Sequence, residues 1–389
     1  MGKTLFQTGP LERGVFLERV NRFVVRFRRG RAEGIAHLAN PGRLAEVLLP
    51  GTELLLERRP QNQLAWKAVG ATWSARWPGD RPRTVYLDTT RINLLAERLI
   101  AEKLIPELRH YQIDRREIAD GKSRFDFLLR ARHGSFLLEV KSVTLAERGL
   151  AFFPDARTER GRRHLQALAR YGDRRRRRAG VLFLVQGAVD RFLPDFHNDL
   201  DFARTFSAVR SRVALLPYRV DPALGDDGGI AFAGRPTRLR VPWRLLDAGV
   251  RDAGLYLLVL HVPQDTCVEV GALGPRTYRS GFYVYTGSAR RGLDQRIARH
   301  LRRRKRLHWH IDFLRAHSPR VQAFPIRGAS DECGLAAGMG RVGGSLVADF
   351  GSSDCRCAGH LVWFPESPVH TAAFQELLTR MRHAGGSSA

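Results

Sequence analysis

Lysine is scarce in this chain of 389 residues: only six of its 65 basic residues are lysine, and the others are arginine. Aspartate and glutamate together number 39, which leaves a formal net charge of +26 at pH 7. A basic excess of this size favours a polyanionic partner, and nucleic acid is the commonest one. A GC-rich genome that enriches arginine in all of its proteins is the alternative explanation of this composition.

Cysteines and long apolar runs are also few. Four cysteines are too few for a disulfide framework in a chain of this length. The longest apolar run, around residues 181–185, is far shorter than the roughly 20 residues of a membrane-spanning helix. Residues 1–6 show neither a signal core nor a myristoylation pattern. These absences predict a cytoplasmic protein, with nucleic acid rather than membrane as its partner.

Apolar residues make up 43% of the chain, and three segments differ in their pattern. Residues 1–82 show short strand-like runs separated by Gly and Pro, which is typical of a small β-barrel. Residues 83–245 mix helical and strand patterns, and so do residues 246–389. The predicted fold class is therefore a multidomain α+β protein, in which a β-barrel precedes two α/β domains.

Local patterns in the middle segment allow closer predictions. A helix begins after a threonine cap, either Thr89 or Thr90, and another spans about residues 158–171. The Gly-, Asp- and Pro-rich residues 221–240 are typical of a linker. The arginine block at 174–178 is a solvated face by default, but it also suits phosphate contacts.

The strongest chemical pattern is a hairpin with two carboxylates and a lysine. Its predicted register pairs Leu129 with Phe136, Phe127 with Leu138 and Phe125 with Val140. The opposite face then pairs Asp126 with Glu139 and places Lys141 alongside. Two carboxylates this close repel each other, so we expect a cation between them, and Mg²⁺ suits such a site. The pattern predicts metal-dependent phosphodiester hydrolysis; an exposed face with an ordinary Glu–Lys pair is the alternative.

Longer motifs around this hairpin resemble those of the SfsA family, the sugar fermentation stimulation proteins. The motifs are residues 123–128, 139–145 and 153–165, with 19–23 and 40–44 in the N-terminal segment. The resemblance covers about residues 5–240. It implies an OB-fold domain at 1–82 and a PD-(D/E)XK nuclease-like domain at 83–245. Members of the family are regarded as DNA-binding proteins and candidate nucleases.

The resemblance also implies roles for single residues. Asp126, Glu139 and Lys141 fall on the three core nuclease positions, and the two carboxylates are expected to hold Mg²⁺ or Mn²⁺. Lys141 is expected to orient the attacking water or to stabilise the developing charge. Nucleases of this kind usually carry a further acid on a helix; Glu97 and Glu102 are both candidates, and that role stays unassigned.

A second family motif implies that Asp155, Arg160 and His164 lie near this site. For Asp155, a metal role and a turn or helix cap are equally good interpretations, and His164 is as well explained by packing as by catalysis. Three arginines are expected to contact nucleic acid, with DNA favoured over RNA: Arg22, Arg43 and Arg124.

Residues 246–389 resemble a GIY-YIG-like domain of uncharacterised activity, which in some proteins is attached to DNA-repair enzymes. The two half-motifs are 254–256 and 283–288, separated by more residues than in standard GIY-YIG nucleases. The resemblance implies a second candidate site of five residues: Tyr256, Tyr285, Arg296, His300 and Glu332.

Cys333, Cys355, Cys357 and His360 are a candidate zinc set. Their Cys-x-Cys-x-x-His spacing is tighter than that of a standard zinc finger, so the favoured interpretation is four small buried residues.

Together these patterns predict a DNA- or RNA-binding protein that hydrolyses phosphodiester bonds with Mg²⁺. The alternative is a DNA-binding transcriptional regulator of sugar-metabolism genes, whose nuclease-like domain is not catalytic.

Overall fold

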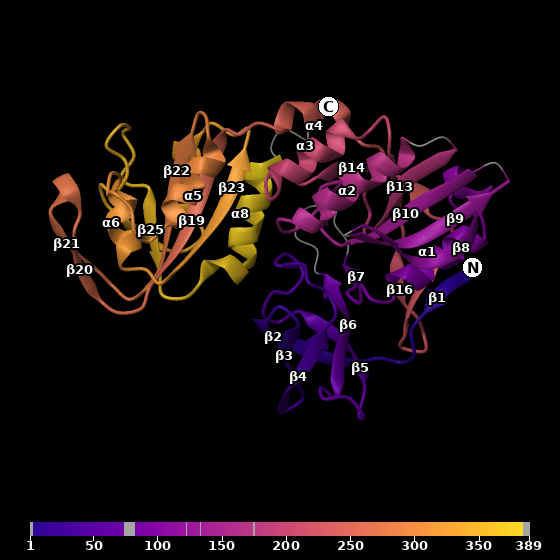
Figure 1. Cartoon of the computed structure of the whole chain (residues 1–389). Helices are drawn as coiled ribbons and strands as arrows, with labels where there is room; N and C mark the ends of the chain where they lie inside the picture. The colour runs from indigo at the N-terminus through magenta and orange to yellow at the C-terminus, as the bar shows by residue number, and fades with distance from the viewer. Residues whose placement is uncertain (1–2, 74–81, 122, 133, 174–175, 384–389) are drawn as a thin grey trace. The chain divides into compact units, whose positions relative to one another are not determined.

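The computed structural model describes residues 3–73, 82–121, 123–132, 134–173 and 176–383 (Figure 1). The chain divides into two compact units, Met1–Asp247 and Ala248–Ala389. Across the described residues, no helix has both the length and the apolar character needed to cross a membrane.

Unit 1 contains the predicted β-barrel. Its strands are β2 (Glu12–Asn21), β3 (Val24–Arg29), β4 (Ala32–Leu38), β5 (Glu53–Arg58) and β6 (Trp66–Trp73). They pair in the order β4-β3-β2-β5-β6, and a parallel pairing of β4 with β6 closes the barrel. Alternating apolar residues such as Val25 and Phe27 fill its interior, as the period of a half-buried strand predicts. β7 (Arg83–Tyr86) then pairs with β6 and leads out of the barrel.

A six-stranded sheet forms the centre of the rest of unit 1. Its order is β18 (Thr237–Arg238), β15 (Ala214–Arg219), β13 (Arg177–Val185), β10 (Gly134–Val143), β9 (Ser123–Ala131) and β8 (Gln112–Asp120). A smaller sheet joins β11 (Ala146–Glu147), β12 (Leu150–Phe153) and β14 (Arg191–Pro194). β10, β13 and β15 are parallel neighbours with almost wholly buried sequences, which is typical of a sheet covered on both faces.

Helices cover both faces of the large sheet. α1 (Ile92–Ala101), followed by a short turn η1 (Pro106–Leu108), packs its apolar stripe on Phe127, Leu138 and Leu182. α2 (Glu159–Gly172) and α3 (Leu200–Ala208) lie on the opposite face, where Phe206 packs on Phe183. The helix predicted at 158–171 is therefore confirmed as α2.

The predicted threonine cap of α1 is wrong. The N-cap residue is Arg91, which makes no side-chain cap hydrogen bond. The hydroxyl of Thr89 instead donates to the carbonyl of Ala39 (2.7 Å), and that of Thr90 to Asp88 Oδ1 (2.6 Å). Thr89 is thus used in a tertiary contact and Thr90 in a local contact with Asp88, so neither hydroxyl caps the helix.

The predicted linker at 221–240 is also wrong. Its residues form β16 (Pro222–Leu224), β17 (Ile230–Ala233) and β18, and β17 pairs with β1 (Thr4–Gln7). The glycines make the turn of a hairpin, while Ile230 and Phe232 are buried in the core of unit 1. The hairpin therefore ties the start of the chain to the far end of this unit.

Unit 2 has a five-stranded antiparallel sheet. The order is β23 (Arg320–Arg327), β19 (Gly254–Val262), β22 (Gly281–Ala289), β25 (Leu361–Phe364) and β24 (Ser345–Val347). Its helical elements are α5 (Leu293–Leu301), α6 (His310–Ala316), α7 (Glu332–Gly340), η3 (Pro368–His370) and α8 (Ala372–His383), and α4 (Trp243–Gly249) spans the boundary with unit 1. α5 and α6 contribute to one apolar cluster of the sheet, α7 and α8 to the other.

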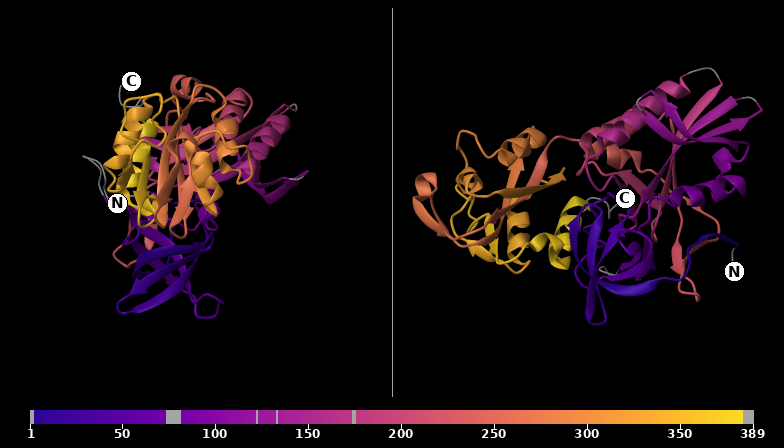
Figure 2. Two further views of the ribbon diagram at one scale, coloured as in Figure 1. Left: turned by 90° about the vertical axis from the view of Figure 1, so that its left-hand side faces the viewer. Right: turned by 60° about the horizontal axis from the view of Figure 1, so that its bottom comes forward.

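A hairpin of β20 (Thr266–Glu269) and β21 (Pro275–Tyr278), with η2 (Gly271–Leu273) between them, extends from the sheet of unit 2. It is visible beyond the end of that sheet in Figure 1 and in the right-hand view of Figure 2. The predicted α+β fold class, with a barrel before two α/β regions, is confirmed.

Candidate active site

The β9–β10 hairpin carries Asp126, Glu139 and Lys141. Its ladder follows the predicted register as far as the pair Phe127 and Leu138. The predicted pair of Phe125 with Val140 does not continue the ladder. Instead, the Asp126 carboxylate accepts a hydrogen bond from the backbone N–H of Val140 at Oδ2 (2.7 Å). A side chain thus takes the place of a backbone partner where the two strands separate.

Asp126 is also bound by a residue that the sequence did not indicate. Asn93, on the first turn of α1, donates from Nδ2 to Asp126 Oδ1 (2.8 Å). Burial raises the pKa of the Asp126 carboxyl above its usual range, and the negative charge of Glu139 raises it further. Oδ1 of Asn93 is itself buried and has no hydrogen-bond partner among the described residues.

The two oxygens of Glu139 have different environments. Oε1 contacts the ammonium of Lys141 and lies 2.8 Å from Nδ1 of His164 on α2. Burial acts to raise the pKa of Glu139, but the hydrogen bond from His164 and the charge of Lys141 outweigh it and lower that pKa. Oε2 is buried and lacks a hydrogen-bond partner within the described part of the chain. Glu139 is therefore an ionised carboxylate with one unsatisfied oxygen.

These groups line a cleft of about 660 Å³. One wall comes from the barrel, at Arg22 and the loop residues 40–42, and another from the start of α2, at Arg157 and Arg160. Asp126, Glu139 and Lys141 lie between them. The cleft thus combines an acidic interior with guanidinium groups on its walls.

Asp155, in the loop before α2, holds the barrel against this domain. Its carboxylate accepts hydrogen bonds from the backbone N–H groups of Arg43 and Leu44, and burial raises its pKa. At Gly42 a Cβ atom would lie 2.3 Å from Asp155 Oδ2, so only glycine allows the loop to approach this closely. The hydroxyl of Thr158, not Asp155, caps α2 by accepting from Gly161 N (3.0 Å), and the cap interpretation of Asp155 is wrong.

Arg19, which the sequence did not single out as a site residue, shapes the same barrel loop. Its guanidinium donates to the carbonyls of Arg22 (2.7 Å), Asn40 (3.0 Å), Gly42 (2.5 Å) and Arg43 (2.7 Å). Five guanidinium N–H donors suit such a set of converging carbonyls. Its place in the 19–23 motif was the only signal for this contact.

Of the other candidate residues of unit 1, His164 and Arg160 lie close to Glu139 or the cleft, whereas Arg124 does not. His164 is buried against the ring of Phe125 (5.0 Å between centroids), and Arg160 Nε lies 3.4 Å from His164 Nε2. Arg124 lies outside the cleft and pairs with Glu117 (3.0 Å).

The two candidate helical acids also lie outside the cleft. Glu97 pairs with Arg116, and Glu102 pairs with Lys3 (2.6 Å). The position on α1 that contacts the carboxylate site belongs to Asn93.

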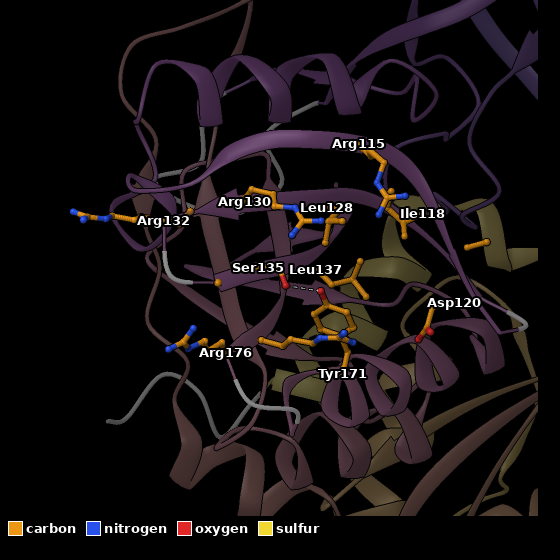
Figure 3. A pocket seen from close by; sticks show the side chains of 14 residues that line it. Arg115, Ile118, Asp120, Leu128, Arg130, Arg132, Ser135, Leu137, Tyr171 and Arg176 are labelled. Carbon is orange, nitrogen blue, oxygen red and sulfur yellow. Dashed lines mark hydrogen bonds between the residues drawn. The ribbon is translucent and has the colours of Figure 1, made fainter.

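A second pocket, of about 490 Å³, lies at the other end of the same strands (Figure 3). Its lining includes five arginines, Arg115, Arg130, Arg132, Arg176 and Arg177, together with Asp120. Ser135 Oγ lies 2.8 Å from Tyr171 Oη, as the dashed line in Figure 3 shows, and the guanidinium of Arg177 lies 5.1 Å from the Tyr171 ring. Residues 174 and 175 of the predicted arginine block lie outside the described residues.

This arginine pocket and the carboxylates share one face of β10. Ser135 contacts α2 through Tyr171, and Glu139 contacts α2 through His164. Glu139 lies four residues after Ser135 in the strand, which corresponds to about 13 Å along the sheet. The arginine pocket and the carboxylate cleft therefore lie at successive positions along the same strand.

The two half-motifs of unit 2 lie on neighbouring antiparallel strands, with Tyr256 of β19 opposite Gly287 of β22. A Cβ atom on Gly287 would lie 2.5 Å from the Tyr256 ring, so glycine makes room for the tyrosine. Tyr256 Oη lies 3.0 Å from His300 Nε2, and His300 Nδ1 lies 3.3 Å from Asp312 Oδ1. Burial raises the pKa of Tyr256 and lowers that of His300.

The remaining residues of the second candidate site lie near the linked side chains of Tyr256, His300 and Asp312. The rings of Tyr285 and Tyr256 are 6.3 Å apart, and Arg296 lies over the ring of Trp309 at 4.9 Å. The charges of Arg296 and Glu332 both act on Tyr256, with opposite effects on its pKa. The structure thus brings together Tyr256, Tyr285, Arg296, His300 and Glu332, the five residues that the resemblance indicated.

Three family models match successive parts of the chain. They are the SfsA N-terminal OB domain at residues 17–77, the sugar fermentation stimulation protein RE domain at 90–225, and a domain of unknown function, DUF123, at 255–383. A sugar fermentation stimulation protein homologue from Methanothermobacter thermautotrophicus is 35% identical over 210 residues, which are 53% of this chain and 84% of the relative. The chain belongs to the SfsA family.

Other SfsA relatives agree with this assignment. The homologue from Chloroflexus aurantiacus is 37% identical over 240 residues, 59% of this chain and 90% of the relative. The solved structure of Pyrococcus furiosus SfsA in complex with Ca²⁺ is 29% identical, with a TM-score of 0.53, and covers 61% of this chain and 99% of that one. Beyond the SfsA portion, the DUF123 match in unit 2 is consistent with the GIY-YIG-like module indicated by the two half-motifs.

Proposed function

We propose that the SfsA portion of this chain is a metal-dependent nuclease that hydrolyses phosphodiester bonds in the cleft between the barrel and the start of α2. The observation that carries the proposal is Glu139 Oε2, a buried carboxylate oxygen with no hydrogen-bond partner in the described residues. Leaving such an oxygen unpaired is costly, and a bound cation removes that cost. Asp126 and the unpaired Oδ1 of Asn93 line the same cleft.

This donor set fits a hard divalent cation. Carboxylate and amide oxygens are ligands that Mg²⁺ and Ca²⁺ prefer, and Mg²⁺ commonly uses one or two carboxylates together with substrate phosphate oxygens. When bound, the cation would polarise a phosphate oxygen and lower the pKa of a water molecule. The complex of the Pyrococcus furiosus SfsA with Ca²⁺ supports a divalent-cation site in this family.

The residues of the chain itself have separate tasks in this proposal. His164 and Lys141 both act on Oε1 and keep Glu139 ionised, so that the unsatisfied Oε2 would be available to hold the cation. The Lys141 ammonium, partly exposed to the cleft, is positioned to orient the attacking water or to stabilise negative charge developing on the phosphate. Asn93 fixes the carboxylate of Asp126 through the hydrogen bond from its Nδ2.

The charge distribution supports nucleic acid as the substrate, and we propose DNA in preference to RNA. Arg22, Arg157 and Arg160 line the cleft, and five further arginines line the pocket at the other end of the same strands, where they suit phosphate contacts. The OB barrel adds a fold that commonly binds single strands, with Phe23 exposed beside Arg22.

The test is cleavage of labelled single- and double-stranded DNA and RNA by the full chain, with Mg²⁺ or Mn²⁺. Glu139→Gln is expected to abolish cleavage, and Lys141→Ala to lower it by about 10²- to 10³-fold. Tyr256→Phe, which alters only the site in unit 2, is expected to leave it intact. Tight binding without cleavage by the unaltered chain would refute the nuclease proposal and favour a DNA-binding regulator with a non-catalytic cleft.

A further inference from the structure

Three cysteines and a histidine converge in unit 2, far along the chain from the carboxylate cleft. One ligand atom from each of Cys333, Cys355, Cys357 and His360 lies within 4.8 Å of all the others. Cys333 is on the first turn of α7, and the other three are in the segment that leads into β25. The interpretation of these residues as four small buried side chains is wrong, because Cys333 is exposed and Cys355 and Cys357 are partly exposed.

We propose that these four side chains form a tetrahedral Cys₃His site for a zinc ion. Zinc–sulfur bonds of about 2.3 Å and zinc–nitrogen bonds of about 2.0 Å require ligand atoms about 3.5–3.8 Å apart in a tetrahedral site. Cys355 Sγ lies 3.5 Å from His360 Nε2, which already matches one edge of such a tetrahedron. The 4.8 Å limit on the other edges leaves only small side-chain movements to complete the site.

The environment of His360 provides a second, independent observation. Its Nδ1 lies 3.1 Å from Glu332 Oε1, so the ring presents Nε2 to the cysteines. A histidine that binds zinc almost always donates its other ring N–H to a carboxylate or a carbonyl, which fixes the tautomer and the orientation of the ring. The contact with Glu332 therefore gives His360 the orientation of a zinc ligand.

The backbone holds the ligand segment in place. His360 N donates to Phe350 O (2.8 Å), Asp349 N donates to Ala358 O (2.7 Å), and Thr286 N of β22 donates to His360 O (2.9 Å). All four cysteines of the chain are free thiols in the structure. Three thiols held this close, one on α7 and two in the segment before β25, suit a soft divalent cation.

The site is structural rather than catalytic, since four protein ligands leave no open position on the metal. The zinc site also affects the second candidate site, because Glu332 contacts His360 and belongs to that site. A zinc ion that fixes the His360 ring would fix the Glu332 carboxylate within reach of Arg296 and Tyr256. This inference rests on unit 2 alone and does not depend on the nuclease proposed for unit 1.

The experiment measures metal content and cobalt spectra of the full chain, purified under reducing conditions. About one zinc per chain is expected. Co²⁺ should bind in its place and give the visible bands of tetrahedral cobalt with a thiolate charge-transfer band. Cys333→Ser, Cys355→Ser, Cys357→Ser and His360→Ala should lose the zinc. Cys267→Ser is the matched control, because Cys267 is an exposed cysteine on β20 outside the cluster, and it should keep the metal.

Two further results decide the inference if the ligand variants fail to fold. The unaltered chain must bind Co²⁺ with a thiolate charge-transfer band; a chain that binds neither Zn²⁺ nor Co²⁺, or binds Co²⁺ without that band, overturns the proposal. Glu332→Gln keeps all four ligands and should weaken zinc affinity about 10- to 100-fold. Unchanged affinity in that variant would overturn the link between the zinc and Glu332.

Discussion

Nδ1 of His164 lies 2.8 Å from Oε1 of Glu139, the carboxylate oxygen that also contacts Lys141. Both donors therefore act on one oxygen, and the buried Oε2 on the other side has no hydrogen-bond partner where the chain is described. Oε1 of Glu139 is thus fixed by its two partners, whereas Oε2 is unsatisfied. The predictions for the metal site of unit 1 follow from this difference between the two oxygens.

Glu139→Gln should remove the response of the protein to divalent cations. Saturating Ca²⁺ at about 100 times its dissociation constant should stabilise the unaltered chain by about 2.7 kcal/mol, since it binds the folded state alone. The variant should show little of this gain in urea denaturation with and without CaCl₂. Glu97→Gln is the matched control, because Glu97 pairs with Arg116 outside the cleft and should leave the response unchanged. Equal responses in the two variants would contradict the metal site.

Lys141→Met should separate binding from chemistry. The change keeps the length of the side chain and removes its charge, so Ca²⁺ should still stabilise the protein. Cleavage should fall by about 10²- to 10³-fold, the range observed when one group that stabilises the transition state is removed. Lys141→Arg should not restore the rate, because a planar guanidinium cannot replace a compact ammonium. A variant that loses both properties together would argue for a purely structural lysine.

The pKa of Asp126 gives a pH dependence with a definite sign. Because burial and Glu139 raise this pKa, the metal-free folded protein should lose stability as pH rises from the usual aspartate range through the raised pKa. Ca²⁺ binds the ionised form, so its stabilising effect should grow over that same interval. Melting curves from about pH 4 to pH 8, with and without Ca²⁺, measure both trends. A calcium effect independent of pH would exclude Asp126 as a ligand.

The three principal residues of the cleft were predictable because strand alternation is local. A period of two places Glu139 and Lys141 on one face of β10, and the apolar partners Phe127 and Leu138 fix the register. The Thr158 cap of α2 is likewise a local pattern, formed by residues three apart in the chain.

Contacts between distant parts of the chain were not predictable from these patterns. Asn93 contacts Asp126, which lies 33 residues later in the chain, and Arg19 contacts four carbonyls of the barrel. The β9–β10 ladder ends before Asp126 for a similar reason. The N–H of Val140 donates to the carboxylate of Asp126 and not to a backbone carbonyl of β9. Neither propensity nor periodicity describes such a contact.

The arginine pocket should contribute to affinity by binding phosphates. Replacing Arg132 and Arg177, which line the pocket, with alanine should lower the slope of log affinity against log salt by about 0.9 for each phosphate of duplex DNA that is no longer neutralised. Filter binding over a range of KCl concentrations measures the slope, and Ca²⁺ stabilisation should not change. Arg124→Ala serves as control, because Arg124 pairs with Glu117 outside the pocket. An equal decrease of the slope in the control would indicate a diffuse charge effect.

Gly42 and Asp155 should behave as a coupled pair. Asp155→Ala leaves the N–H groups of Arg43 and Leu44 without their acceptor and should lower the free energy of unfolding by about 1–3 kcal/mol. Gly42→Ala should also destabilise the protein, since its Cβ would meet Asp155 Oδ2. In the double variant that clash is absent. Gly42→Ala should therefore lower the free energy of unfolding less in the Asp155→Ala background than in the unaltered chain. Strict additivity in denaturant titrations would contradict the direct contact.

The pairing of β1 with β17 has a consequence for synthesis on the ribosome. Thr8 accepts a hydrogen bond from the backbone of Ile230, 222 residues later in the chain. The barrel has its own core and can fold early in synthesis. β1, in contrast, has no partner strand until residues 230–233 have emerged from the ribosome. During that interval the N-terminal strand is an unpaired edge, open to wrong partners, and unit 1 is complete only when its last hairpin closes over its first strand.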